Sequence, residues 1–429
     1  MPKDSEDGPA KKPASTARIL LASMVGTAVE FYDFYIYGTA ASLVFGPLFF
    51  PRTDGSSQLL ATYATFAVAF IARPIGALAF GHFGDRIGRK STLVTSLLLM
   101  GCSTIAIGLL PSYAEAGLWA PLLLCALRFC QGLGLGGEWG GAALLAVENA
   151  PAGFSGRYGM MPQLGAPIGF IASNGLFLIL GLILSPDQFL QWGWRLPFLG
   201  SLPLIALGLW IRLRIAETPA FTAAAAKTAP PKVPLTELLR GFPREVVAGT
   251  FAVIACFAIF YLSTTFALGY GTTVLHLERR LFLELQLAAI PFMAIGTVWA
   301  GLWSDRSTPR RVLAWGCAGV VVAGGLLSPM LGSGDPLTVW AFLAISLLMM
   351  GLVYGPLGVF LPSLFPIRVR YSGISLAFNA GGILGGALAP MLAQELASTG
   401  NLAYVGVYLS GAAAVSLAGL ATVGRRAAE

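Results

Sequence analysis

The chain has 429 residues, of which 56% are hydrophobic and 11% are charged, and its formal net charge is +7. A soluble protein of this length needs far more charge on its surface, so the composition excludes a soluble globular protein. Apolar runs long enough to cross a bilayer recur along the whole chain, which is typical of membrane-spanning helices.

The first 17 residues are polar and rich in Pro, Ala and Lys, and we expect a disordered tail there. The next apolar segment is long enough to span a membrane, so we interpret it as a first helix and not as a signal peptide. Twelve spans are expected, all helical because each must satisfy its own backbone in lipid. Their expected limits are 18–50, 57–81, 91–111, 117–145, 156–184, 194–213, 245–270, 282–303, 311–332, 336–364, 372–396 and 402–424.

The longest expected loop, 214–244, contains AAAAKTAPPKVP, which is typical of a linker. It separates an N-terminal six-helix half (18–213) from a C-terminal six-helix half (245–424), and 425–429 form a second tail. The halves are similar: GHFGDRIGRK (81–90) and GLWSDRSTPRR (301–311) occupy matching positions, as do GRYG (156–159) and VRYSG (369–373). A duplicated twelve-span chain predicts a transporter with its substrate near the midplane, between the halves.

The positions of Lys and Arg predict the orientation. An even number of spans places both termini on one side, and that side holds most of the 27 Lys and Arg residues. The loops of the other side hold only Arg52, Arg195, Arg279 and Arg280. Both termini are therefore expected in the cytoplasm. The same asymmetry explains the net charge without nucleic acid as a partner.

Neither a metal site nor a cofactor is expected. The five cysteines fall inside apolar segments, where buried free thiols are the expectation. His82 and His276 are far apart in the sequence and cannot complete a zinc cluster or a Ser-His-acid set. The chain is therefore not expected to be an enzyme.

The loop after the second span carries a family resemblance. Gly81-x-x-x-Asp85-Arg86-x-Gly88-Arg89-Lys90 resembles the signature loop of the major facilitator superfamily. The resemblance implies the twelve-helix fold of two pseudo-symmetric halves, with this loop latching them together on the cytoplasmic side. The second copy has Thr308-Pro309 in place of the x-Gly pair, so its latch is expected to be weaker. The candidate latch residues are Gly81, Asp85, Arg86, Gly88, Arg89, Lys90, Asp305, Arg306, Glu148 and Arg157.

Further segments extend the resemblance. LCALRFCQGLG (124–134) resembles the superfamily's fourth-span motif, whereas GAPIGF (165–170) departs from its antiporter motif, which favours symport. VEFYDFYIYG (29–38), GGEWGGAALL (136–145) and QFLQWGWRLPF (188–198) look like the metabolite:proton symporters. That subgroup includes permeases for shikimate, α-ketoglutarate, citrate and proline/betaine, and the match looks closest to the shikimate-type branch. The resemblance implies proton-coupled uptake but does not fix the substrate.

Five ionisable residues are expected deep inside the spans, where each charge costs roughly 2.5–3.5 kcal/mol: Glu30, Asp33, Arg73, Arg128 and Glu138. They are either static ion pairs that fasten helices together, or a proton site beside an anion site. Carboxylates can exchange protons and arginine cannot, so we expect Asp33 to carry the proton, with Glu30 as second candidate. Arg128 and Glu138 complete the expected proton-coupling set. When an anionic substrate binds the arginine, the carboxylate loses that partner and takes up a proton.

The same region supplies candidate substrate contacts. A planar guanidinium matches a carboxylate in two-point geometry, and uncharged polar side chains could contact hydroxyl groups, although tyrosines in spans are often interfacial anchors. The candidates are Arg73, Arg128, Tyr37, Gln131, Gln163, Tyr261, Tyr354 and Asn379. Asn379 is favoured because an amide in the middle of a span needs a partner.

These observations favour a secondary transporter, a monomer in the bacterial inner membrane, that imports a small carboxylate with protons by alternating access. Two alternatives remain open within the class. One is a proton-coupled permease for a zwitterionic osmolyte or amino acid of the proline/betaine type, and the other is an exporter. A membrane enzyme or a channel would not depend on a proton gradient.

Overall fold

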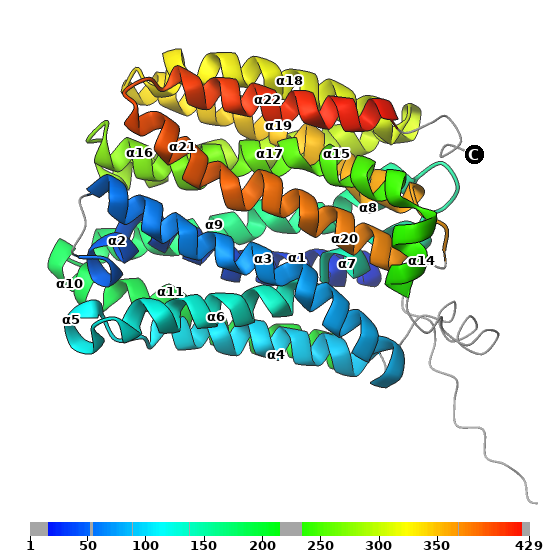
Figure 1. Cartoon of the computed structure of the whole chain (residues 1–429), viewed down its shortest axis with the longest axis horizontal. Coiled ribbons are helices and arrows are strands. Elements are labelled where there is room, and N and C mark those ends of the chain that lie inside the picture. The colour runs from blue at the N-terminus through cyan, green and yellow to red at the C-terminus, as the bar shows by residue number, and fades with distance from the viewer. Residues whose placement is uncertain are drawn as a thin grey trace, which may run out of the picture.

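The computed structural model describes residues 16–51, 55–87, 89–136, 138–214, 234–367 and 369–422. Within these ranges all regular structure is helical, and the helices lie side by side along one long axis (Figure 1). Nine helical stretches in the described part are long and apolar enough to cross a membrane, and Val94–Gly108 is a shorter apolar helix. The fold is the expected all-helical bundle.

The N-terminal half supplies the first six expected spans. In chain order its elements are α1 (Thr16–Ala40), η1 (Ala41–Phe45), α2 (Gly46–Phe49), α3 (Gly55–Ile87), α4 (Arg89–Gly108), α5 (Tyr113–Ala116), α6 (Trp119–Leu135), α7 (Glu138–Glu148), α8 (Ser155–Gln163), α9 (Gly165–Ile183), α10 (Pro186–Gln191), η2 (Gly193–Arg195), α11 (Leu196–Leu199) and α12 (Ser201–Arg214). Several expected spans are thus built from two or three helical pieces.

The C-terminal half follows the same plan. Its elements are α14 (Pro234–Gly241), α15 (Pro243–Tyr261), η3 (Leu262–Phe266), α16 (Ala267–Thr273), α17 (Arg279–Arg306), α18 (Pro309–Leu331), α19 (Pro336–Ser363), α20 (Arg370–Gly382), η4 (Ile383–Ala387), α21 (Leu388–Ser398) and α22 (Ala403–Thr422). The expected linker 214–244 is helical in part, since it contains α14, while residues 215–233 lie outside the described ones.

The bundle has two ends, which we call the terminal end and the far end. The last helix, α22, finishes at the terminal end, where α14 also lies, and α2, α5, α10 and α16 lie at the far end (Figure 1). The short helix α5 at the far end has a capping box, because the backbone N–H and hydroxyl of Ser112 donate to Glu115 at 2.7 and 3.0 Å. These bonds hold the pKa of the Glu115 carboxyl below its ordinary value.

Helices in the N-terminal half approach each other closely where glycines face a neighbour. A Cβ added to Gly132 of α6 would lie 2.1 Å from the Ala69 carbonyl oxygen of α3, and one added to Gly76 would lie 2.0 Å from that of Leu133. No larger residue fits at either position without moving a backbone. The α3–α6 pair is therefore packed backbone to backbone, as small residues permit in membrane helices.

Three described spans contain a turn of π-helix. These turns are η1 in the first span, η3 in the seventh and η4 in the eleventh, and the fifth span is interrupted between α8 and α9. The first and seventh spans occupy the same place in the two halves, as do the fifth and eleventh. A π-turn leaves carbonyl groups without their usual helical partner, so it creates acceptors inside the bundle.

Contacts between the halves run along the length of the bundle. Helix α17 packs against α8 and α9, α20 packs against α3 and α7, and η1 meets η3. The inner spans of both halves thus meet along the centre of the bundle.

Candidate substrate and proton site

A small cavity lies between the halves. Its free volume is about 10 Å³, which is room for about one water molecule. Both halves line it, with Phe34, Tyr35, Gly38, Thr39, Phe66, Phe170 and Asn174 on one side and Tyr261, Thr264, Thr265, Leu268 and Gln286 on the other. Among the sequence-predicted substrate contacts, Tyr261 lines this cavity.

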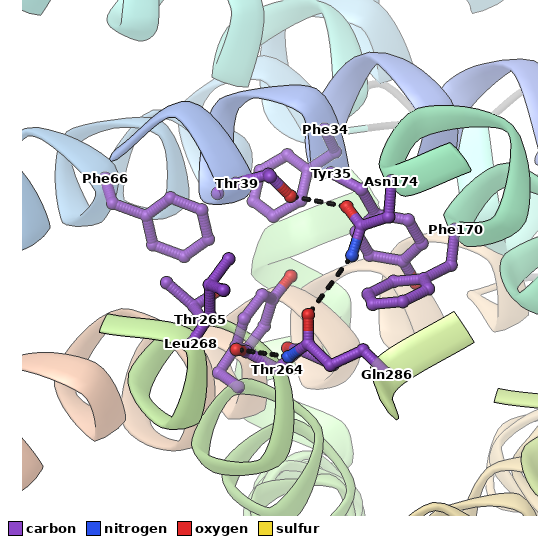
Figure 2. A pocket seen from close by; sticks show the side chains of 12 residues that line it. Phe34, Tyr35, Thr39, Phe66, Phe170, Asn174, Thr264, Thr265, Leu268 and Gln286 are labelled. Carbon is purple, nitrogen blue, oxygen red and sulfur yellow. Dashed lines mark hydrogen bonds between the residues drawn. The ribbon is translucent and has the colours of Figure 1, made fainter. Parts of the chain in front are cut away.

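A chain of polar groups crosses the cavity from one half to the other (Figure 2). The Thr39 hydroxyl donates to the Asn174 amide oxygen at 2.5 Å, and the Asn174 amide nitrogen donates to Gln286 at 3.3 Å. Gln286 in turn donates to the Thr264 carbonyl at 2.8 Å. Asn174 and Gln286 were not predicted from the sequence. The signal was available, because each is an amide within an apolar run, the property that singled out Asn379.

The π-turn η3 supplies acceptors at the far-end side of this cavity. Gln286 bonds the carbonyls of Ser263 and Thr264, and the Thr265 carbonyl accepts from two side chains of the other half. These donors are Tyr63 of α3, at 3.1 Å, and Ser42 of η1, at 2.9 Å. The single hydroxyl hydrogen of Ser42 is shared with the Gly38 carbonyl of its own span, at 3.0 Å. The halves are therefore hydrogen-bonded together between the cavity and the far end.

Arg128 of α6 is fully buried, and all its contacts are with neutral groups. Its Nη1 donates to Gln131, its Nη2 lies 3.4 Å from the Phe66 carbonyl, and its Nε has no acceptor among the described residues. The guanidinium lies 3.6 Å from the centre of the Tyr37 ring, whose hydroxyl shares a hydrogen bond with Thr65. Among the described residues, Arg128 forms no ion pair with an acid.

Arg73 of α3 is buried nearby in an aromatic setting. Its guanidinium carbon lies 4.2 Å from the centre of the Phe70 ring and 4.4 Å from that of Phe34. Its Nε, like that of Arg128, has no hydrogen-bond acceptor among the described residues.

Asp33 of α1 is completely buried beside hydroxyl groups. Its Oδ1 accepts from Ser201 at 2.5 Å, and its Oδ2 makes no hydrogen bond among the described residues. The Thr104 hydroxyl is within reach, but its proton is committed to the Met100 carbonyl. The Glu138 carboxylate, on α7, accepts from Ser96 at 2.6 Å.

The sequence suggested that Glu30 or Asp33 meets one of the buried arginines. For Asp33 this is not what the structure shows, because within the described residues it pairs with neither Arg73 nor Arg128. Gln131 connects the two groups instead: it accepts from Arg128 and donates to Thr104 at 2.8 Å and to the Asp33 backbone carbonyl at 3.3 Å.

A second layer closes the cavity toward the terminal end. The rings of Trp139 in α7 and Phe378 in α20 stack with centres 3.6 Å apart and planes 4° from parallel. Trp139 also donates toward Gln163 at 3.1 Å and Tyr354 at 3.2 Å, and Asn379 donates to the Gly136 carbonyl at 2.8 Å. Gln163, Tyr354 and Asn379, predicted as substrate contacts, thus join the halves here and do not line the cavity.

Some of the candidate latch residues meet at the terminal end. Asp305 pairs with Arg157 at 3.0 Å and accepts from the Gly156 backbone at 2.7 Å, and Arg370 lies 3.9 Å from Glu148. Arg306 is exposed and forms no ion pair in the described part. Gly88 lies outside the described residues, and the structure describes no side chains for Gly81, Asp85, Arg86, Arg89 and Lys90.

Solved structures share this arrangement. The D-xylose–proton symporter XylE of E. coli, bound to 6-bromo-6-deoxy-D-glucose, superposes with a TM-score of 0.75 over 94% of each chain at 14% identity. The partially occluded, inward-open form of XylE gives a TM-score of 0.73 over 94% of this chain and 96% of the other. These likenesses establish the fold.

Sequence comparisons place the chain in a family. Residues 19–240 match the family described as "Sugar (and other) transporter". The "Inner membrane metabolite transport protein YhjE" of Escherichia coli K12 is 47% identical over 95% of this chain and 93% of its own length. The chain belongs to the major facilitator superfamily.

Relatives within the superfamily are named for different substrates. The "Shikimate transporter" of E. coli K12 is 35% identical over 91% of each chain. The "Proline/betaine transporter" of the same organism is 32% identical over 93% of this chain and 82% of its own length. The resemblance seen in the sequence motifs is confirmed, and so are the twelve-helix fold and the assignment as a membrane transporter, not an enzyme.

Proposed function

We propose that this transporter is a proton-coupled symporter that imports a small organic acid across the bacterial inner membrane, as a monomer with both termini in the cytoplasm. The observation that carries the proposal is Arg128. A fully buried guanidinium, without an acid partner among the described residues, lies behind the Phe34 and Phe66 rings that line the cavity. A buried charge needs a partner, and an anionic substrate supplies one.

One edge of the Arg128 guanidinium is free for a ligand. Nε has no acceptor among the described residues, and Nη2 has only the long contact to the Phe66 carbonyl. These two nitrogens form the edge that grips a carboxylate with two parallel hydrogen bonds. For a substrate in the cavity to reach this edge, the rings of Phe34 and Phe66 have to move aside.

Asp33 supports the proton half of the proposal. Protonated at Oδ2, it could donate to the Thr104 hydroxyl, which has a lone pair left after accepting from Gln131. Gln131 then links the binding of the substrate at Arg128 to the binding of the proton at Asp33. A carboxylate on Arg128 displaces the Gln131 oxygen, which disturbs the bonds of Gln131 to Thr104 and Asp33 and so alters the surroundings of the proton site.

Alternating access follows from the two closures. The Thr265 bonds and the Asn174–Gln286 bond hold the far end shut, and the Trp139–Phe378 stack with the Asp305 pair holds the terminal end shut. Opening one set while the other persists exposes the cavity to one side at a time. A ligand shifts this equilibrium only through its different affinities for the two open states.

Transport by purified protein in liposomes tests the proposal. Labelled shikimate is the first probe, followed by α-ketoglutarate, citrate, proline and glycine betaine, each with and without an imposed inward proton gradient. We expect at least one organic acid to accumulate above its outside concentration and to leak out when a protonophore is added. Gradient-independent equilibration, or export driven by the same gradient, would contradict the proposal.

A permease for a zwitterion is the second candidate, because a relative at 32% identity is named a proline/betaine transporter. In this case proline or glycine betaine, and none of the acids, would accumulate in the same assay.

A further inference from the structure

If an anionic substrate binds Arg128 as proposed above, the positions of Arg73 and Arg128 around the cavity also indicate whether the substrate carries a positive charge. Aromatic faces bind ammonium groups by cation–π attraction, and aromatic rings are abundant here. In this chain, however, two of the rings that line the cavity, Phe34 and Phe66, already face the chain's own arginines. Arg73 lies over Phe34 and Phe70, and Arg128 lies over Tyr37, with its guanidinium carbon also 5.2 Å from the ring centres of Phe34 and Phe66.

A cationic group on the substrate would therefore meet two positive charges. Repulsion between like charges in a poorly hydrated site weakens binding, and we expect a loss of affinity of about tenfold or more. Zwitterions such as proline or betaine are disfavoured by this arrangement.

Arg128 also bears on the number of carboxylates. Its free edge, formed by Nε and Nη2, holds one carboxylate in two-point geometry. A substrate with a single carboxylate therefore suits this site better than one with two or three.

The remaining polar groups of the cavity are neutral. Asn174 and Gln286 are buried amides, and the Asn174 amide nitrogen uses one of its two hydrogens in the bond to Gln286. The second hydrogen is available to a hydroxyl or ether oxygen. These amides can therefore bind uncharged polar groups next to the aromatic walls formed by Phe170 and Tyr261.

We propose that the substrate carries one carboxylate and no positively charged group, with an uncharged polar remainder. The inference rests on the proposed function, because it assumes that an organic acid occupies Arg128, and it narrows the acids to monoanions.

Matched probes test it by thermal stabilisation and calorimetric binding to the purified full-length protein. Tetrahydrofuran-2-carboxylate and proline have the same ring size and carboxylate but differ in the ring's charge, and cis-cyclopentane-1,2-dicarboxylate adds a second carboxylate. Shikimate, glycine betaine, α-ketoglutarate and citrate complete the panel. We expect the tightest ligand to be a monocarboxylate, and tetrahydrofuran-2-carboxylate to bind about tenfold or more tightly than proline or the dicarboxylate.

Arg73→Gln gives a second test, which is the change in preference between a zwitterion and an anion. Loss of a purely structural contact would not change this preference. Removing this guanidinium takes away one positive charge and frees the Phe34 and Phe70 faces for a cationic group. Relative affinity for proline over tetrahydrofuran-2-carboxylate should therefore rise at least several-fold. Arg280→Gln is the control, because Arg280 is exposed and pairs with Glu284 on its own helix, and it should leave the preference unchanged.

The outcomes separate this inference from the proposed function. Tighter binding of proline, betaine or a dicarboxylate by the wild-type protein would overturn the inference, and a dicarboxylate that accumulates with protons would still leave the proposed function standing. An unchanged preference in a folded Arg73→Gln protein would also count against it. Failure of every acid in the panel to bind would overturn both.

Discussion

At the scale of residues, Gln131 connects two buried charged side chains, because it accepts from the Arg128 guanidinium and donates to the backbone carbonyl of Asp33. All five ionisable residues expected at depth are buried, as their positions inside apolar runs required: Glu30, Asp33, Arg73, Arg128 and Glu138. A change of one or two residues in a helix boundary, or a rotation of the helix, decides which acid faces which arginine. The sequence carries no direct signal for that rotation, so the connection of Arg128 to Asp33 through Gln131 was not foreseen.

Arg128→Lys tests the anion site. Lysine keeps the positive charge but presents a single ammonium in place of the Nε and Nη2 edge, so two-point binding is lost. We expect the affinity for the transported acid to fall about tenfold or more while the protein stays folded, as measured by calorimetric titration and thermal unfolding. Arg280→Lys, at an exposed position, is the matched control, and equal affinities of the Arg128→Lys and wild-type proteins would remove Arg128 from the site.

Asp33→Asn tests the proton carrier. Asparagine keeps the size of the side chain and can still accept from Ser201, but it cannot exchange a proton. Gradient-driven accumulation of the acid in liposomes should disappear while exchange of labelled for unlabelled acid persists. Glu115→Gln, at the far end and exposed, should retain both activities. Accumulation by the Asp33→Asn protein at the wild-type level would show that the proton travels elsewhere.

At the scale of elements, the apolar runs identified the spans because a helix needs a minimum length to cross lipid. The π-turns η1, η3 and η4 were not predicted, since a π-turn and an α-turn in an apolar run have the same hydrophobic pattern. These turns matter for the proposed function, because the Thr265 carbonyl in η3 accepts the hydrogen bonds that join the halves near the far end. Likewise, the linker composition did not reveal α14.

The double variant Ser42→Ala, Tyr63→Phe tests that closure. It removes both donors to the Thr265 carbonyl, together worth about 1–3 kcal/mol, and should shift the equilibrium toward opening at the far end. The readout is maleimide labelling of a cysteine placed at Leu59, which is buried and packs near Gly269 of the other half, in a background without the native cysteines.

Labelling of that cysteine should become about fivefold to hundredfold faster in the double variant. Thr272→Val is the control, because the Thr272 hydroxyl bonds only carbonyls of its own helix within the described part. Equal labelling rates in the double variant and in the control would show that these bonds do not hold the far end shut.

At the scale of the whole molecule, duplication and family motifs were sufficient to predict the fold, because GHFGDRIGRK and its second copy indicate two similar halves. Duplication and motifs do not predict which conformation of the two halves is populated. In the closed arrangement Gln163, Tyr354 and Asn379 join the halves. Their contact with the substrate depends on the equilibrium between the closed and open arrangements, which no single span determines.

The most direct test of the central claim is proton uptake upon ligand binding. The purified protein in weakly buffered detergent solution is mixed with the organic acid from the panel that binds most tightly, and the change in pH is recorded beside the heat of binding. The account predicts that the wild-type protein takes up protons as the acid binds, so its affinity falls as pH rises, whereas Asp33→Asn binds without proton uptake. Binding by the wild-type protein with no proton uptake, or uptake undiminished in Asp33→Asn, would contradict it.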